Sequence, residues 1–382
     1  MRDLSRTYYL FLGFHGFLLG LFPFFLPVYL YKNGSSLSEI ALFIALSGLG
    51  FIITLWGWDR LRSNLFRRMI IASLLLGLSV VWSVYFGVDL TIVALLNGGY
   101  NCLYWMIQRI LFFSTISPEN SGRKFGNFQI FVLVVLKAGI FVGSILLGGF
   151  GLIAICILSL IVVCVAILLF SYRDTDFLEI PALLQQRPSI RISDLTSFKD
   201  RYYSRLIFAV DGVFLYLESY FWLISLFLLV GESFVKLGLV VIGLALFLGV
   251  LFFLIKNRID RLQVQKVYRV SVLLYALSWV MRGSISGDMS YSLQMCMIVL
   301  IGFSTSFFRL AFNKRFFDLA GLSIGYDYIF FKSYYSQFFL ACTLFLFAVI
   351  LQVYSKSVEL LPFIYWIAAG LTFIYLKYSI KL

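Results

Sequence analysis

The sequence predicts an all-α polytopic membrane protein with twelve transmembrane helices. Of its 382 residues, 62% are hydrophobic and only 13% are charged, and a water-soluble domain of this size has no use for so much apolar surface. Apolar segments recur along the chain at about the 20 residues that a helix needs to cross the hydrocarbon core. Lipid offers the backbone no hydrogen-bond partner, so we expect these segments to be helices and not strands.

Twelve such segments follow one another with short connections. The two closest pairs of neighbours, joined at Val88–Asp89 and at Gly149, must be antiparallel because so few residues connect them. The first segment is too long for the core of a signal peptide, and we expect it to remain in the mature protein. The expected spans are 8–30, 40–56, 69–87, 90–112, 127–148, 150–171, 206–229, 235–255, 270–286, 291–312, 331–353 and 358–378.

Basic residues concentrate on one side of these spans. The tails and loops on the side of the N-terminus hold 23 of the 31 Lys and Arg residues, as in GWDRLRSNLFRR at 57–68, whereas the other side holds Lys32, Lys236, Arg282 and Lys356. By the positive-inside rule both termini are cytoplasmic, and the short loops and tails favour a bacterial inner membrane. The net charge of +13 is therefore a matter of topology, and we expect lipid and no nucleic acid around a monomeric protein.

Several residues recur at a nearly constant distance along the chain. This repeat predicts two pseudo-symmetric six-helix halves, 1–171 and 206–382, joined by a polar cytoplasmic linker at 172–205. Paired halves of this kind are an architecture of secondary transporters, with a substrate site near the midplane between them. The recurring pairs are Asp59 and Asp260, Arg60 and Arg261, Arg109 and Arg309, and His15 and Asp211, with offsets from 196 to 201.

Three motifs resemble those of the major facilitator superfamily. LWGWDRLRSN at 55–64 keeps the Asp-Arg pair of the family motif GxLxDRxGRR, but Leu55 and Arg62 stand at its two glycine positions. SPENSGRKFG at 117–126 is similar to the loop after the fourth helix, and GIFVGSILLGG at 139–149 is similar to the glycine-rich fifth helix of exporters, with Ser144 at the proline position. The resemblance covers the whole chain and implies the same fold.

The resemblance also implies a cytoplasmic charge network that gates the carrier. Partly buried ion pairs can bias two arrangements of rigid bodies that differ by only a few kcal/mol. The alternative is that some of these arginines only anchor helix ends at the lipid headgroups. The residues carried over by position are Asp59, Arg60, Arg109, Glu119 and Arg123 in the first half and Asp260, Arg261 and Arg309 in the second.

Charged residues inside the spans are candidates for a substrate or coupling site, because burying a charge there costs about 2.5 to 3.5 kcal/mol on insertion scales. Lys137 lies at the middle of the fifth span and needs an acidic partner or an anionic ligand. Asp211 and Glu218 are seven residues apart, so both project from one helix face. We expect Glu218 to pair with Lys137, whereas Asp211 lies nearer the cytoplasmic end and has solvation as an alternative.

The remaining candidates are neutral or titratable near pH 7. His15 occupies the repeat position of Asp211 and is either a coupling group or a packed residue. Asn101 and Gln108 supply hydrogen bonds to a substrate or between helices. Tyr104 and Tyr216 add amphipathic surface in spans that line the cavity of the resembling family, although such aromatic residues are more often packing surface.

These residues favour a secondary transporter that works by alternating access. The interior basic groups outnumber the acidic ones, which favours a small organic anion or zwitterion as substrate, with proton coupling left open. The alternative within transport is an efflux carrier for amphiphilic drug-like compounds. From other classes, a sensor or assembly factor on the same fold is a further alternative.

A membrane-embedded enzyme is disfavoured. Such an enzyme needs a clustered nucleophile, base or metal site. The chain has one histidine, and its five cysteines all fall inside expected spans with neither a disulfide framework nor a zinc spacing. We therefore expect no catalytic residues, no metal and no cofactor.

Overall fold

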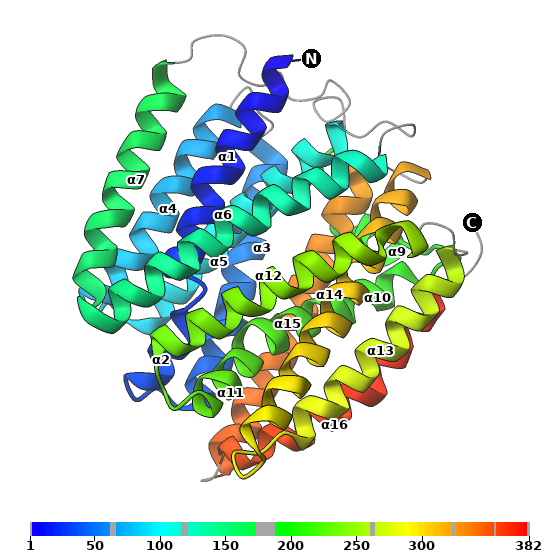
Figure 1. Ribbon diagram of the computed structural model, residues 1–382. Coiled ribbons are helices and arrows are strands. Elements are labelled where there is room, and N and C mark those ends of the chain that lie inside the picture. The colour runs from blue at the N-terminus through cyan, green and yellow to red at the C-terminus, as the bar shows by residue number, and fades with distance from the viewer. Residues whose placement is uncertain are drawn as a thin grey trace.

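The computed structural model describes residues 2–61, 66–115, 121–172, 188–259, 264–322, 325–354 and 357–379. Within these ranges every regular element is a helix, as the sequence predicts (Figure 1). The elements up to the linker are α1 (Arg2–Leu21), α2 (Leu26–Lys32), α3 (Leu37–Leu61), α4 (Phe66–Tyr85), α5 (Leu90–Thr115), α6 (Ser121–Gly149) and α7 (Leu152–Tyr172). Those that follow are α9 (Ile192–Ser197), α10 (Ser204–Tyr216), η1 (Leu217–Phe221), α11 (Trp222–Leu229), α12 (Phe234–Ile259), α13 (Val264–Ser284), α14 (Tyr291–Leu322), α15 (Tyr326–Val353), η2 (Ser357–Leu360), α16 (Leu361–Leu371) and η3 (Thr372–Ser379).

Ten helical runs among the described residues are long and apolar enough to cross a membrane. They occupy ten of the twelve expected positions, so the chain is a multi-pass membrane protein. The fifth expected position falls in α6, where Val134–Gly149 forms a shorter apolar segment, and the ninth falls in α13. Twelve spans therefore remain a prediction.

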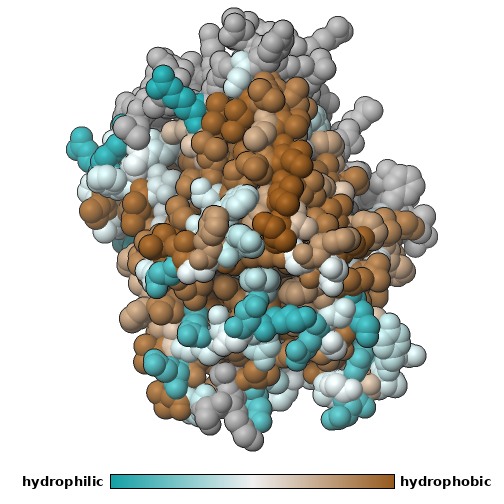
Figure 2. Space-filling view, turned by 90° about the vertical axis from the view of Figure 1, so that its left-hand side faces the viewer, coloured by the Kyte–Doolittle hydropathy of each residue, from teal (hydrophilic) through white to brown (hydrophobic). Residues whose placement is uncertain are grey.

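The outer surface suits contact with lipid. Side chains of α7 are turned outward, and Ile161 and Leu168 keep 53% and 68% of their surface exposed. Figure 2 shows the side of the molecule on which α7 lies, where hydrophobic residues form a broad area above a band of hydrophilic ones. Exposed apolar side chains on this scale are expected where acyl chains replace water as the solvent.

Two spans expected to be continuous helices are interrupted near their middle. The span at 8–30 breaks into α1 and α2 through a turn at Phe22–Phe25, and Pro27 stands in the first turn of α2. The span at 206–229 contains the π-helical turn η1 between α10 and α11. The offset that relates His15 to Asp211 also carries this turn of the first span onto η1. Proline explains the first interruption, since it cannot donate to the helix ladder.

Helices from the two ends of the chain form two groups that meet along paired helices. In the first group α1 packs on α6, α3 on α5 and α4 on α7, while in the second α10 packs on α15 and α13 on α14 and α16. Contacts between the groups join α3 to α15 and α6 to α12. In Figure 1 the helices up to α7, coloured blue to green, and the helices from α10 onward, coloured green to red, accordingly lie on opposite sides of the molecule.

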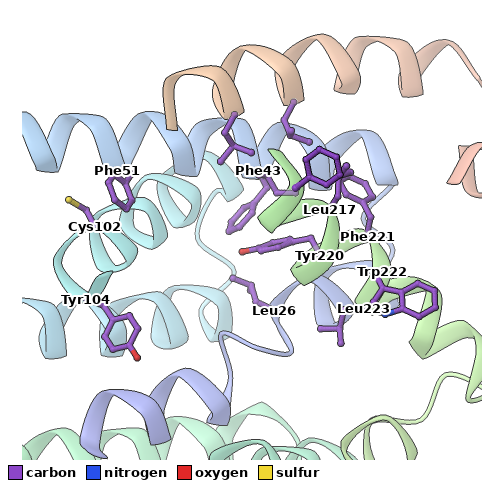
Figure 3. Packing of buried hydrophobic residues seen from close by; sticks show 14 of the residues in the cluster. Leu26, Phe43, Phe51, Cys102, Tyr104, Leu217, Tyr220, Phe221, Trp222 and Leu223 are labelled. Atoms are coloured by element: carbon purple, nitrogen blue, oxygen red, sulfur yellow. The ribbon is translucent and has the colours of Figure 1, made fainter. Parts of the chain in front are cut away.

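Aromatic side chains fill the contact between α2, α3 and η1. Figure 3 shows Tyr220 of η1 between Phe43 of α3 and Leu26 of α2. The rings of Phe43 and Tyr220 have centroids 6.4 Å apart. Nδ2 of Asn97 in α5 donates to the Tyr220 hydroxyl at 3.5 Å. The first and second groups of helices are thus in contact around Tyr220.

The close packing of α3 on α5 depends on a glycine. A Cβ atom at Gly98 would lie 2.0 Å from the backbone oxygen of Ser47, which is backbone and cannot turn away. We therefore predict that Gly98→Ala destabilises the protein by about 1 to 3 kcal/mol through overpacking. Gly57→Ala is the matched control, because nothing lies within 4 Å of a Cβ atom there. Thermal unfolding of the purified proteins in detergent measures both, and equal melting temperatures would contradict the prediction.

Candidate functional site

A cavity of about 440 Å³ lies between the two groups of helices. Its described lining comes chiefly from α5 on one side and from α10, η1, α14 and α15 on the other. The volume lies within the range of ligand pockets, roughly 300 to 1,000 Å³. The cavity can therefore hold a small organic molecule.

Four charged side chains form one cluster at the wall of this cavity. Arg309 of α14 places Nη1 2.6 Å from Oδ1 of Asp211 and Nη2 3.0 Å from Oε2 of Glu218. Nζ of Lys332 in α15 lies 3.1 Å from the other oxygen of Asp211. Two cations thus face two carboxylates, and the cluster is neutral as a whole.

Two tyrosine hydroxyls complete the cluster. Tyr275 of α13 donates to Oε1 of Glu218, and its ring stacks on Phe308 with centroids 4.1 Å apart. Tyr375 of η3 donates to Oδ1 of Asp211 at 3.2 Å. Each carboxylate therefore has a cation and a neutral donor, which is what a buried carboxylate requires.

The local backbone explains how the two carboxylates reach Arg309. Asp211 is fully buried in α10, and the neighbouring Gly212 lets α10 approach α15 so closely that a Cβ would lie 2.2 Å from the Ser336 backbone oxygen. Glu218 lies in the π-helical turn η1, and π-turns are frequent at functional sites because they change the direction of side chains. Both side chains project from one face, as their spacing predicts.

Arg109 is the third basic residue of the cavity and differs from the other two. It lies partly exposed on α5, and its Nη1 donates to the Ser333 hydroxyl at 3.0 Å. Among the described residues no carboxylate lies within ion-pairing distance of it. A cation held in the protein interior by a neutral hydroxyl can accept an anionic ligand.

Three of the neutral candidates also line the cavity. Asn101 and Gln108 lie on α5 and Tyr216 ends α10. Asn101 donates to the backbone oxygen of Asn97 at 2.9 Å, so its amide is partly engaged within its own helix. Asn101 and Gln108 form, together with Arg109, a polar strip along the α5 wall.

The structure places His15 and Tyr104 away from the described lining of the cavity. His15 is fully buried, and its Nε2 lies 2.9 Å from the Ser73 hydroxyl. Its ring packs against Phe11 at 4.5 Å and Tyr104 at 5.5 Å between centroids. The packed alternative named for His15 is the environment observed here.

Lys137 does not meet Glu218. It is partly buried on α6, and among the described residues it has no hydrogen-bond or ion-pair partner. Glu218 instead pairs with Arg309 and accepts a hydrogen bond from Tyr275. The expected pair therefore does not form in this structure, because Arg309, and not Lys137, lies within ion-pairing distance of Glu218.

The structure describes only some of the proposed gating residues, so the charge network stays a prediction. Asp59 is buried and accepts a hydrogen bond from the backbone N–H of Ile190 at 2.8 Å. The guanidinium carbon of Arg60 lies 3.8 Å from the ring centroid of Trp56. The two gating arginines of spans 4 and 10, described above, lie at the cavity. Glu119, Asp260 and Arg261 lie outside the described residues, and Arg123 lies in α6 with its side chain outside them.

Sequence reasoning missed Lys332, Tyr275 and Arg282. Lys332 is the one charged residue of the expected span 331–353, which is a usable signal. Arg282 was counted in an outer loop, yet it is 3% exposed and donates to Ser278 and Thr305 at 2.8 and 2.7 Å. Arg282 lies within the expected span 270–286, so a charge inside a span was a usable signal here as well.

Several solved structures of membrane transporters are similar to this chain over nearly their whole length. A nucleoside transporter, NupG, aligns with a TM-score of 0.68 and 14% identity, covering 99% of each chain. A D-xylose-proton symporter has a TM-score of 0.64 and 12% identity over 99% of this chain and 98% of that one. The POT family transporter PepTSo has a TM-score of 0.60 and 12% identity over 98% and 97%. No family model and no curated protein sequence matches the chain.

The shared pairing of Arg309 predicts the stability of variants. Arg309→Gln leaves Asp211 with Lys332 and Tyr375, and Glu218 with Tyr275 and no cation, so we expect a loss of about 3 to 5 kcal/mol in stability. Adding Glu218→Gln to this variant should restore much of the loss, because Lys332 still pairs with Asp211 and residue 218 no longer carries a charge. Melting temperatures in detergent measure the series.

Arg269→Gln is the control for this series, since Arg269 is exposed on α13 and donates only to Ser379 among the described residues. A loss at Arg309→Gln no larger than in this control, or no recovery in the double variant, would contradict the pairing.

Identities of 12 to 14% establish the fold alone, and the fold is the one that the sequence motifs predict. The chain therefore shares its fold with these solved membrane transporters.

Proposed function

We propose that the chain is a secondary active transporter that moves a small organic anion or zwitterion by alternating access. The observation that carries the proposal is the charge balance of the cavity. Asp211, Glu218, Arg309 and Lys332 neutralise one another, and Arg109 adds one positive charge without a described carboxylate partner. An anionic group of the substrate would supply the missing partner, and charge-assisted bonds to arginine are strong in such surroundings.

We further propose that twelve spans form two six-helix halves, 1–171 and 206–382, which rock about this cavity with the linker 172–205 between them. The repeated residue pairs and the interruptions of the first and seventh spans at corresponding positions support this division. The excess of basic residues on one side of the spans supports cytoplasmic termini in a bacterial inner membrane. Alternating access by rocking halves around a fixed site follows from such an architecture.

Arg109→Gln tests the proposal directly. We expect this variant to lose more than 90% of carboxylate uptake into proteoliposomes. This is a tenfold loss, which corresponds to about 1.4 kcal/mol of binding free energy. Arg109→Lys should keep part of the uptake. Arg269→Gln, far from the cavity lining, serves as the matched loss of a positive charge. Equal uptake of every tested carboxylate by Arg109→Gln and the unaltered protein would contradict an anion site at Arg109.

An efflux carrier for amphiphilic compounds is the second candidate, and the aromatic side chains of the cavity favour it. Trp105 and Tyr216 offer ring surface to an apolar ligand. The same Arg109→Gln variant separates the candidates, because export of neutral amphiphiles does not need the guanidinium. Retained export of neutral dyes with no carboxylate uptake in the unaltered protein would select the efflux carrier.

Proton coupling is proposed through Glu218. If the substrate takes donors of Arg309, Glu218 loses its counter-charge, and a proton that enters with the substrate would replace that charge. We predict that Glu218→Gln abolishes the stimulation of uptake by an inward proton gradient but retains substrate exchange at equal pH. Parallel assays in proteoliposomes measure both rates, and unchanged stimulation in a variant of normal melting temperature would exclude this role.

A further inference from the structure

Aromatic rings form most of the apolar wall of the cavity. Eight of the 23 described lining residues are aromatic and four are aliphatic or proline, whereas 19% of the whole chain is aromatic. The wall is thus richer in flat surfaces than the rest of the protein. Flat side chains bind flat ligands best, because offset stacking adds to the burial of area.

The unpaired cation lies beside one of these rings. Trp105 precedes Arg109 by one turn of α5, and the guanidinium carbon lies 6.0 Å from the centroid of its indole ring. Trp105 lines the cavity and keeps 36% of its surface exposed, so part of the indole is free to meet a ligand. Arg109 can therefore bind a charged group of a ligand, and the adjacent Trp105 can pack on its ring.

The facing wall repeats this combination. Nζ of Lys332 lies 4.5 Å from the ring centroid of Phe316, which also lines the cavity. Phe112 of α5 meets Phe317 of α14 edge to face at 4.7 Å between centroids. Rings from both groups of helices thus surround the end of the cavity at which Arg109 lies.

We propose that the substrate class is an aromatic monocarboxylate, with its carboxylate on Arg109 and its ring against Trp105. This inference rests on the proposed function, since it assigns a ligand to the same cavity. A carboxylate conjugated to a ring is nearly coplanar with it, so both parts reach adjacent anchors on α5 together. One charge is specified because Arg109 is the one cation of the described cavity lining without a described carboxylate partner, and a ligand with two carboxylates would bring one more negative charge than this lining can match.

The test compares ligands that differ only in flatness or in charge. Purified full-length protein in detergent is titrated with benzoate and cyclohexanecarboxylate, with phenylacetate and cyclohexylacetate, and with benzamide and phthalate. We expect each aromatic acid to bind roughly two- to tenfold more tightly than its saturated partner. Benzamide and phthalate should bind more weakly than benzoate.

Two variants assign the preference to residues. Trp105→Leu should reduce benzoate binding to the level of cyclohexanecarboxylate and leave the latter unchanged, and Arg109→Gln should weaken both. Trp56→Leu is the matched control, because Trp56 is 52% exposed, packs on Arg60 and is absent from the described cavity lining. Melting temperatures establish that the variants are folded.

The outcomes separate this inference from the proposed function. Equal binding of aromatic and saturated acids, or equal losses of both in Trp105→Leu, overturns the aromatic class. The proposed transport function would still hold in that case if carboxylate uptake depends on Arg109. Failure of all six compounds to bind also overturns it. Binding of benzoate with the expected preference, but no uptake or exchange in proteoliposomes, supports the ligand class and overturns the transporter.

Discussion

One guanidinium, that of Arg309, holds the charged interior of this protein together. It meets Asp211 and Glu218 at 2.6 and 3.0 Å, and each of these carboxylates would be costly to bury alone. Lys332 adds a second cation beside Asp211, so the cluster has no net charge. Because the charges of the cluster cancel, the net charge of the described cavity lining comes from Arg109 on the facing helix α5.

The same region contains the irregular backbone of the fold. In hydrocarbon every backbone polar group must find a partner inside the protein, so a break in a helix is tolerated only where protein or a polar cavity surrounds it. The turn at Phe22–Phe25 and the π-turn η1 both contribute residues to the cavity wall, Pro23 and Glu218 among them. These two irregular turns therefore lie where a ligand can contact them.

The sequence predicts helices and helix faces well and contacts between helices poorly. Composition and segment length predict the membrane helices, and a spacing of seven residues places Asp211 and Glu218 on one face. Spacing along a chain does not measure the distance to another helix, so Lys137 was taken as the partner of Glu218 in place of Arg309. Lys332 went unassigned for the same reason, since its role follows from the close approach of α15 to α10 and not from its neighbours in sequence.

The linker takes part in the contact between the two groups of helices. The backbone N–H of Ile190 donates to Asp59 of α3, and the carbonyl of Leu195 accepts from Tyr335 of α15. The ring of Phe198 adds a stacked contact with α15. Because the linker binds α3 at Ile190 and α15 at Leu195, the few residues between these two positions limit how far the two helices can separate. Any motion that separates α3 from α15 at this end must therefore release one attachment, so the carboxylate of the Asp-Arg motif acts on the linker as well as on its own helix end.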